Sequence, residues 1–291
     1  MESVTRTFLK AHIVAGFAAA LMITPAHAQV ADGSTQSPQQ LGISADPGQV
    51  PSQPSILPAP QPVPAARWSQ TGGFETDTHG TGYGFFGPSY SKPFRPNMAW
   101  VAGVNVNYLF YEYQNAAGGG ETNVRAPGVN ARAGLKFGEK NYFQATAGPS
   151  FKRRNVDVFD AAGTRMSSGD DFRVGVNVGS EAWVEPTTHS VVYGILDFSG
   201  ADSYTWGRLA FREQVSNRTW SNKFAHFVGA EVIGQGNDDI KSTQVGANFE
   251  IVHVPSSVSL QVRGGWKRST FEFGPDKTGP WFAIGFWQRL R

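Results

Sequence analysis

Apolar and polar residues alternate along most of the chain after residue 66. The segment 129–137 carries Val129, Ala131, Ala133, Leu135 and Phe137 at odd positions and Asn130, Arg132, Gly134 and Lys136 at even positions. The segments 143–152, 172–184, 245–251 and 258–266 alternate in the same way. A period of two sends successive side chains to opposite faces of a β-strand, whereas no helical period longer than two turns appears in this region. The pattern therefore predicts an all-β domain whose strands each have one apolar and one polar face.

Twelve runs of this kind are long enough to cross a membrane as strands. They cover residues 67–77, 81–90, 98–114, 125–138, 141–155, 170–185, 188–198, 203–214, 221–234, 240–254, 257–268 and 279–290. A tilted spanning strand needs about 9–11 residues, whereas strands in soluble sandwiches usually have about 5–6. The first two runs are the weakest, which leaves ten strands as the alternative count.

The connections between these runs also differ in length. Short turns are expected at 91–97, 139–140, 186–187, 215–220 and 255–256, and longer loops at 115–124, 156–169 and 269–278. Short periplasmic turns and longer outer loops are typical of outer-membrane barrels. Trp100, Tyr108, Trp281 and Trp287 lie near strand ends, where aromatic girdles form. The sequence therefore predicts a single antiparallel up-and-down transmembrane β-barrel of about twelve strands.

The first 66 residues have a different character. Arg6 and Lys10 flank the start of an apolar run at 11–23, and Ala26-His27-Ala28 supplies the small residues that an export peptidase reads. Residues 29–66 hold eight of the 18 prolines and no aromatic residue, a composition that cannot bury enough apolar surface to fold. We therefore expect a secretory signal peptide at 1–28, a disordered Pro/Gln-rich linker at 29–66 and the barrel domain at 67–291. The expected location is the bacterial outer membrane, with the linker in the periplasm.

Composition and motifs exclude several function classes. The chain has no cysteine, so it has no thiolate metal site and no cysteine nucleophile. Its net charge of +2 gives no sign of the basic surface that nucleic-acid binding requires. Gly82–Gly87 matches G-x-G-x-x-G, but no helical pattern follows it, so we expect no nucleotide site. The histidines beyond the signal peptide are not at metal-ligand spacing. The acidic clusters Asp170-Asp171 and Asn237-Asp238-Asp239 are interpreted as solvated turns. We expect no cofactor and no metal.

The charged residues on the polar strand faces are the candidate functional set. In a barrel with an apolar exterior they face the lumen, and they are Arg132, Lys136, Lys152, Arg173, Glu181, Arg208, Arg212, Glu231, Glu250, Arg263 and Lys267. Eight basic and three acidic side chains predict a lumen charge near +5. Two interpretations stay open: the groups close the interior as a salt-bridged plug, or they line a narrow path for anions or polar saccharides.

A lipid hydrolase or acyltransferase is a further alternative, because some outer-membrane barrels use Ser and His at the lipid boundary. His226 shares an apolar face with Phe224 and Val228. The nearest serine, Ser221, lies on the opposite face of the same run. We therefore expect His226 to be a girdle residue and the protein to be no enzyme.

Several stretches of the barrel domain carry a family resemblance. They are 72–74, 84–91, 179–186, 203–209 and 228–239, the last being a glutamate in an apolar strand followed by a glycine-rich acidic turn. The domain resembles the bacterial cellulose biosynthesis protein BcsS family. The resemblance implies a non-enzymatic accessory role in cellulose or exopolysaccharide biosynthesis or export. Outer-membrane lipid, the polymer and its synthesis or export machinery are then the expected partners. A generic porin or structural barrel without a polysaccharide link is the alternative.

Overall fold

The computed structural model describes residues 67–114, 119–216, 223–272 and 274–290. The predicted signal peptide and linker lie outside the described residues. The strands are β1 (Arg67–Asp77), β2 (Gly82–Arg95), β3 (Met98–Gln114), β4 (Glu121–Phe137), β5 (Tyr142–Phe159), β6 (Arg165–Val184), β7 (Ser190–Ser199), β8 (Tyr204–Ser216), β9 (Phe224–Gly236), β10 (Ile240–His253), β11 (Val258–Phe271) and β12 (Lys277–Leu290). A short 3₁₀ turn, η1 (Val254–Ser256), connects β10 to β11.

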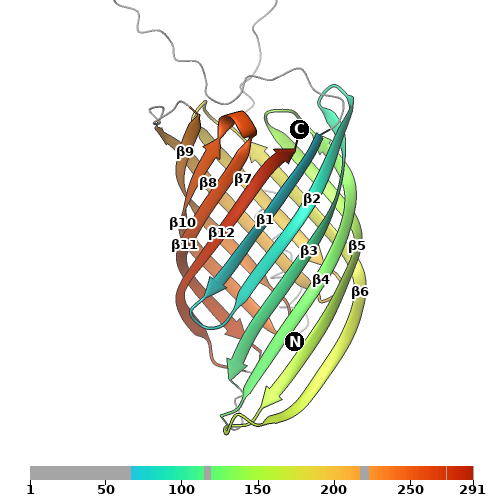
Figure 1. Ribbon diagram of the computed structural model, residues 1–291, viewed down its shortest axis with the longest axis vertical. Helices are drawn as coiled ribbons and strands as arrows, with labels where there is room; N and C mark the ends of the chain where they lie inside the picture. The colour runs from blue at the N-terminus through green and yellow to red at the C-terminus, as the bar shows by residue number, and fades with distance from the viewer. Residues whose placement is uncertain (1–66, 115–118, 217–222, 273, 291) are drawn as a thin grey trace, which may run out of the picture. The chain divides into compact units, whose positions relative to one another are not determined.

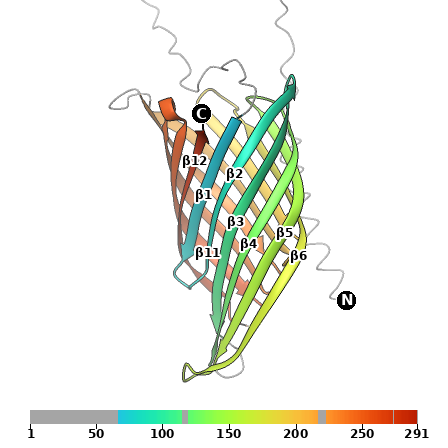
Figure 2. The same ribbon diagram turned by 45° about the vertical axis from the view of Figure 1, so that its right-hand side comes forward.

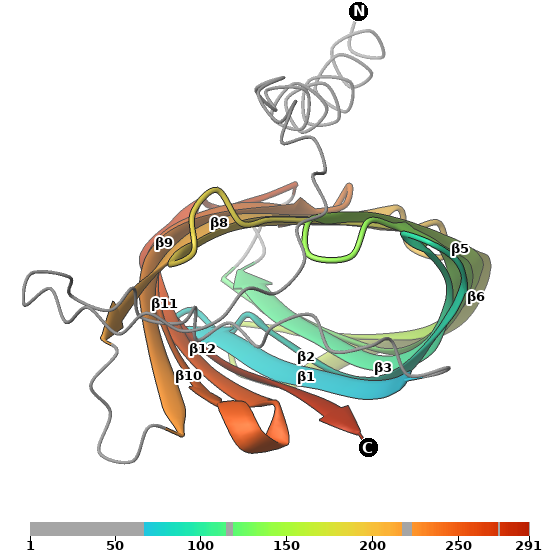
Figure 3. The ribbon, with the colours of Figure 1, turned by 90° about the horizontal axis from the view of Figure 1, so that it is seen from above.

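The strands form a closed barrel in which each pairs antiparallel with its neighbours in sequence (Figure 1). β1 pairs with β12 from Trp68–Leu290 to Asp77–Trp281, so the sheet has no first or last strand, as the end-on view shows (Figure 3). The predicted up-and-down barrel of twelve strands is confirmed. The alternative of ten strands is wrong, because the two weakest runs, β1 and β2, pair with each other along most of their length. Within the described residues, no helix is long and apolar enough to cross a membrane.

The alternation sorts side chains between the two faces of the barrel wall. On β10, Val245 is 55% exposed on the outer face, whereas its neighbour Gln244 is fully buried on the inner face. The same outward set on β6 comprises Phe172, Val174, Val176 and Val178. A soluble β-protein buries its apolar face, but here the apolar face is exposed and the polar face is enclosed. This inverted arrangement is that of a barrel built for a lipid surrounding.

Two predicted loops are partly strand. β4 begins at Glu121, and β5 and β6 continue until only Asp160–Thr164 connects them, so the loop boundaries 115–124 and 156–169 are wrong. The ladder continues because polar side chains support it: Arg165 pairs with Asp157 across the hairpin, and Asp160 accepts the backbone N–H groups of Ala162 and Thr164 at 2.9 and 2.8 Å. The β5–β6 hairpin reaches beyond its neighbours at the end opposite the C-terminus (Figures 1 and 2).

The aromatic residues divide between the two faces. Trp100 and Tyr108 are exposed on the outside, as girdle residues are. Trp281 is only 3% exposed and lies inside, so its predicted girdle role is wrong. Its parity on β12 explains this, because Trp281 and Ala283 share the inner face while Phe282 points outward.

The glycine motif Gly82–Gly87 lies on β2 and precedes no helix. A Cβ at Gly82 would overlap the ring of Phe110 on β3, and one at Gly87 would overlap the carbonyl oxygen of Val104. The glycines therefore permit close approach between strands, which is their structural role here.

Candidate functional site

The structure places all eleven predicted lumen residues on the inner face. Seven are buried: Lys152, Arg208, Arg212, Glu231, Glu250, Arg263 and Lys267. Four are partly buried: Arg132, Lys136, Arg173 and Glu181. The parity of each strand accounts for this placement, since every one of these residues alternates with a lipid-type side chain on the opposite face.

Glu231 on β9 is the centre of the first buried group. Arg208 on β8 donates from both Nε and Nη2 to one carboxylate oxygen of Glu231, at 2.8 Å from Nε. Arg263 on β11 has its Nη1 3.5 Å from the other oxygen. Gln261 lies 3.5 Å from the Arg208 guanidinium. One carboxylate thus holds two guanidinium groups from strands that are not neighbours of each other.

A second buried group lies nearer the end that carries the barrel termini. Arg212 on β8 pairs with Glu250 on β10, and Ser259 donates its hydroxyl to the same carboxylate. The Arg212 guanidinium also lies over the rings of Trp183 and Tyr193, with 5.1 and 4.7 Å to their centroids. Cation–π contacts of this kind stabilise a charge that has been withdrawn from water.

A third buried group forms where β1 closes against the end of the chain. Lys267 on β11 has its Nζ 3.0 Å from Asp77 and 3.9 Å from Glu75. Gln244 and Gln235 donate to the Glu75 carboxylate at 2.5 and 3.3 Å. Ion pairs therefore support the closure of the barrel, and they join Lys267 to residues 190 or more positions earlier in the chain.

The remaining predicted residues lie apart from these groups. Lys136 has its Nζ 3.6 Å from the centroid of the Tyr142 ring, and Tyr142 donates its hydroxyl to Glu181. Arg132 pairs with Asp197 at 3.2 Å. Arg173 lies at the opposite end of the barrel and donates to Asp171 at 2.6 Å.

The predicted interior charge near +5 left out carboxylates that the structure places inside. Glu75, Asp77, Asp197 and Asp202 also lie on the inner face, and each pairs with one of the predicted basic side chains. Sequence reasoning missed them for three reasons. β1 carries only a weak alternation, and the inner face of β7 mixes Asp197 with apolar residues. Asp202 lies in the turn between β7 and β8, where the alternation of a strand does not apply.

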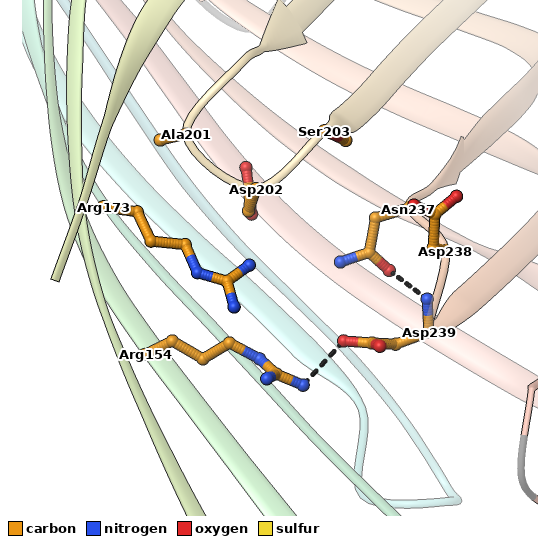
Figure 4. A pocket seen from close by; sticks show the side chains of 8 residues that line it. All are labelled: Arg154, Arg173, Ala201, Asp202, Ser203, Asn237, Asp238 and Asp239. Carbon is orange, nitrogen blue, oxygen red and sulfur yellow. Dashed lines mark hydrogen bonds and ion pairs between the residues drawn. The ribbon is translucent and has the colours of Figure 1, made fainter. Parts of the chain in front are cut away.

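A polar pocket lies at the end of the barrel that carries the β7–β8 and β9–β10 turns, and Figure 4 shows the side chains that line it. It has a volume of about 170 Å³ and is lined by Arg154, Arg173, Ala201, Asp202, Ser203, Asn237, Asp238 and Asp239. We call it the mouth pocket. β5 and β6 supply its arginines, whereas the β7–β8 and β9–β10 turns supply its carboxylates. The sequence carried one signal for it, the acidic turn after β9.

Asp239 corrects the interpretation of that turn as solvated. Arg154 donates to its carboxylate at 2.7 Å, and Tyr111 donates its hydroxyl to the same oxygen at 2.9 Å. The turn itself is closed by Asn237, whose side-chain oxygen accepts the backbone N–H of Asp239 at 3.0 Å. The β9–β10 turn therefore contributes a partnered carboxylate to the barrel mouth.

Other candidate chemistry is not brought together. His226 lies on the outer face with its ring against Phe249, 6.1 Å between centroids and nearly parallel. In the part of the chain that the structure describes, no group of three or more His, Cys, Asp or Glu side chains could hold a metal ion.

Comparison with known proteins gives one family and several solved barrels. Residues 100–290 match the family described as "Cellulose biosynthesis protein BcsS". No protein with a curated description matches the chain.

The similar solved structures have low identity. The β domain of the Bordetella autotransporter Brka is 13% identical, covering 77% of this chain and 99% of that one, with a TM-score of 0.47. The translocator domain of autotransporter NalP from Neisseria meningitidis is 12% identical, covering 77% and 87%, with a TM-score of 0.41. A bacterial polysaccharide outer-membrane secretin is 10% identical, covering 78% and 98%, with a TM-score of 0.33.

Proposed function

Because the chain belongs to the cellulose biosynthesis protein BcsS family, we propose that it is a non-enzymatic outer-membrane accessory protein of cellulose or exopolysaccharide biosynthesis or export. The observation that carries the link to cellulose is the family match, which covers nearly all of β3 and every strand from β4 to the end of β12. Cellulose or a related polymer and the machinery that makes or exports it are the proposed partners.

The outer face supports a membrane location. Leu260, Val262 and Trp266 on β11 and Phe282 and Ile284 on β12 are exposed side by side on the outside. An apolar surface that continues around a barrel is unfavourable in water and favourable in lipid. With the predicted signal peptide removed and the linker in the periplasm, the mouth pocket would face the outside of the cell.

The filled interior supports an accessory role over that of a general pore. Glu231, Glu250 and Glu75 each engage basic groups from strands one or two places away around the barrel. From the other side of the lumen, Tyr111 on β3 and Arg154 on β5 reach Asp239. A solute would have to displace these side chains to pass. Conductance in planar bilayers distinguishes the two functions: we expect no steady current, whereas a steady anion-selective current would favour the porin alternative.

The proposed function is tested in a cellulose-producing host that carries this gene. Deletion of the gene is expected to lower cellulose output, measured by Congo red binding and by glucose released with cellulase. The wild-type gene supplied in trans is expected to restore it. Outer-membrane fractionation and the shift of the unheated band on a gel check that the barrel is inserted. Unchanged cellulose in the deletion strain would overturn the proposal.

A further inference from the structure

The mouth pocket brings together two sets of polar groups that lie far apart in the sequence. Arg154 and Arg173 project from the β5–β6 wall, and Asp202 and Asp239 face them from the two turns on the other side (Figure 4). Hydrogen bonds from Tyr111 and Arg154 hold Asp239 in place. The pocket is therefore a preorganised set of donors and acceptors rather than a random group of surface charges.

Asp202 supplies an acceptor without a partner. Its residue is 9% exposed, and one carboxylate oxygen pairs with the buried Lys152. The other oxygen, Oδ1, is buried and accepts no hydrogen bond among the described residues. A buried charged acceptor normally has all its partners, because an unmade hydrogen bond is unfavourable. A hydroxyl donor bound in the pocket would complete it.

The balance of charge restricts the class of ligand. Arg154 and Arg173 are opposed by Asp202, Asp238 and Asp239, while Lys152 pairs with Asp202 and Asp171 pairs with Arg173 from behind. An ion of either sign would therefore meet its own charge at close range. A neutral ligand with many hydroxyl groups fits better, because each hydroxyl donates to a carboxylate and accepts from a guanidinium or amide.

We propose that the mouth pocket binds a sugar unit of a neutral glucan. This inference rests on the proposed function, which supplies the polymer, and it adds the place where the barrel contacts it. The volume of about 170 Å³ suits a single sugar ring rather than a long stretch of chain. The barrel would thereby hold the polymer at its mouth without opening its interior.

The test uses the full-length protein in detergent micelles and cellotetraose as the probe, with binding measured by titration calorimetry. Saturable binding of cellotetraose is expected, and none of inorganic phosphate or of calcium ions. Arg173→Ala removes a donor, and Asn237→Ala removes a donor together with the acceptor that closes the turn before Asp239. Each change is expected to weaken binding about tenfold. Arg268→Ala is the matched control, because Arg268 pairs with Asp276 on an exposed surface and does not line the pocket. It should bind as the wild type does.

The gel shift of the unheated band shows which variants are folded. Arg173 and Asn237 are changed in separate variants, so that one misfolded variant does not decide the result. Absence of cellotetraose binding, equal binding by folded pocket variants, or preferential binding of phosphate or calcium would each overturn the inference. Failure of the proposed function looks different. In that case deletion leaves cellulose output unchanged while the purified barrel still binds cellotetraose through Arg173.

Discussion

Ion pairs of the same chemistry occupy two very different places in this barrel. In the interior, Arg208 and Glu231 have side chains that are 7% and 0% exposed. On the β5–β6 hairpin, Arg153 and Asp170 form an ion pair whose side chains are 61% and 49% exposed. Water screens the hairpin pair, whereas the interior pair lies in a medium of low dielectric constant. Burial rather than geometry therefore decides how much each pair matters.

The two places also differ in what the pairs connect. Arg153 and Asp170 lie on adjacent strands of one hairpin, so their contact is local. Glu231 on β9 binds arginines from β8 and β11, and Lys267 on β11 binds carboxylates on β1. The interior pairs thus join strands that are adjacent or next-but-one around the barrel, and they line its lumen. The comparison predicts a graded series of mutational effects.

The largest effect is expected from Glu231→Gln. This change leaves the guanidinium groups of Arg208 and Arg263 buried without a carboxylate, and breaking a buried pair in this way costs about 3–5 kcal/mol. The urea midpoint of the heat-modifiable band measures the loss. The double variant Glu231→Gln/Arg208→Gln should recover part of it. A urea midpoint equal to that of the wild type would show that the buried pair contributes no more to the free energy of unfolding than an exposed one.

A smaller effect is expected from Lys152→Met. Asp202 then loses its one basic partner, but it lies in the turn between β7 and β8, which can adjust, whereas Glu231 lies in the middle of a strand. The expected loss is about 1–3 kcal/mol, as for a buried polar group left without its hydrogen bond. The same urea assay applies. A loss of stability as large as that of Glu231→Gln would show that the Lys152–Asp202 pair behaves like the pairs inside the barrel.

No measurable loss is expected from Arg153→Ala. Exposed pairs between flexible side chains contribute little to stability, and salt screens them further. The urea midpoint should match that of the wild type at low and high salt. A clear drop in the midpoint would mean that the β5–β6 extension contributes to the global stability of the barrel.

The last expected effect is a change in the pKa of Asp170 and not in the stability of the barrel. The hydrogen bond and charge of Arg153 lower the pKa of Asp170 below its usual value on the part of β6 that extends past β7. The pair contributes above the pKa of the unfolded carboxyl, about 3.9, and is lost as pH falls through the lower folded pKa. An NMR pH titration of the carboxyl carbon measures the shift. Arg153→Ala should return the pKa of Asp170 to its ordinary range, and an unchanged pKa would contradict the pairing.

Much of the fold could be predicted because successive side chains of a β-strand point to opposite faces of the sheet. The parity of β10 is enough to place Val245 outside and Gln244 inside. The prediction failed where parity was weak or where a strand continued past its neighbours, as on β5 and β6. There, cross-strand ion pairs such as Arg165–Asp157 support the ladder in place of an apolar face.

The sequence by itself determined the class of protein: an inverted alternation, strands of spanning length, and a candidate set of inward charges. Only the tertiary structure decided how those charges meet. Closure of β1 on β12 brings Glu75 and Asp77 to Lys267, and the β7–β8 and β9–β10 turns bring Asp202 and Asp239 opposite Arg173 and Arg154. The reason is that parity fixes the face of a residue, whereas partners across a barrel depend on strand tilt and register, which alternation does not encode. Both the interior ion pairs and the mouth pocket follow from those long-range contacts.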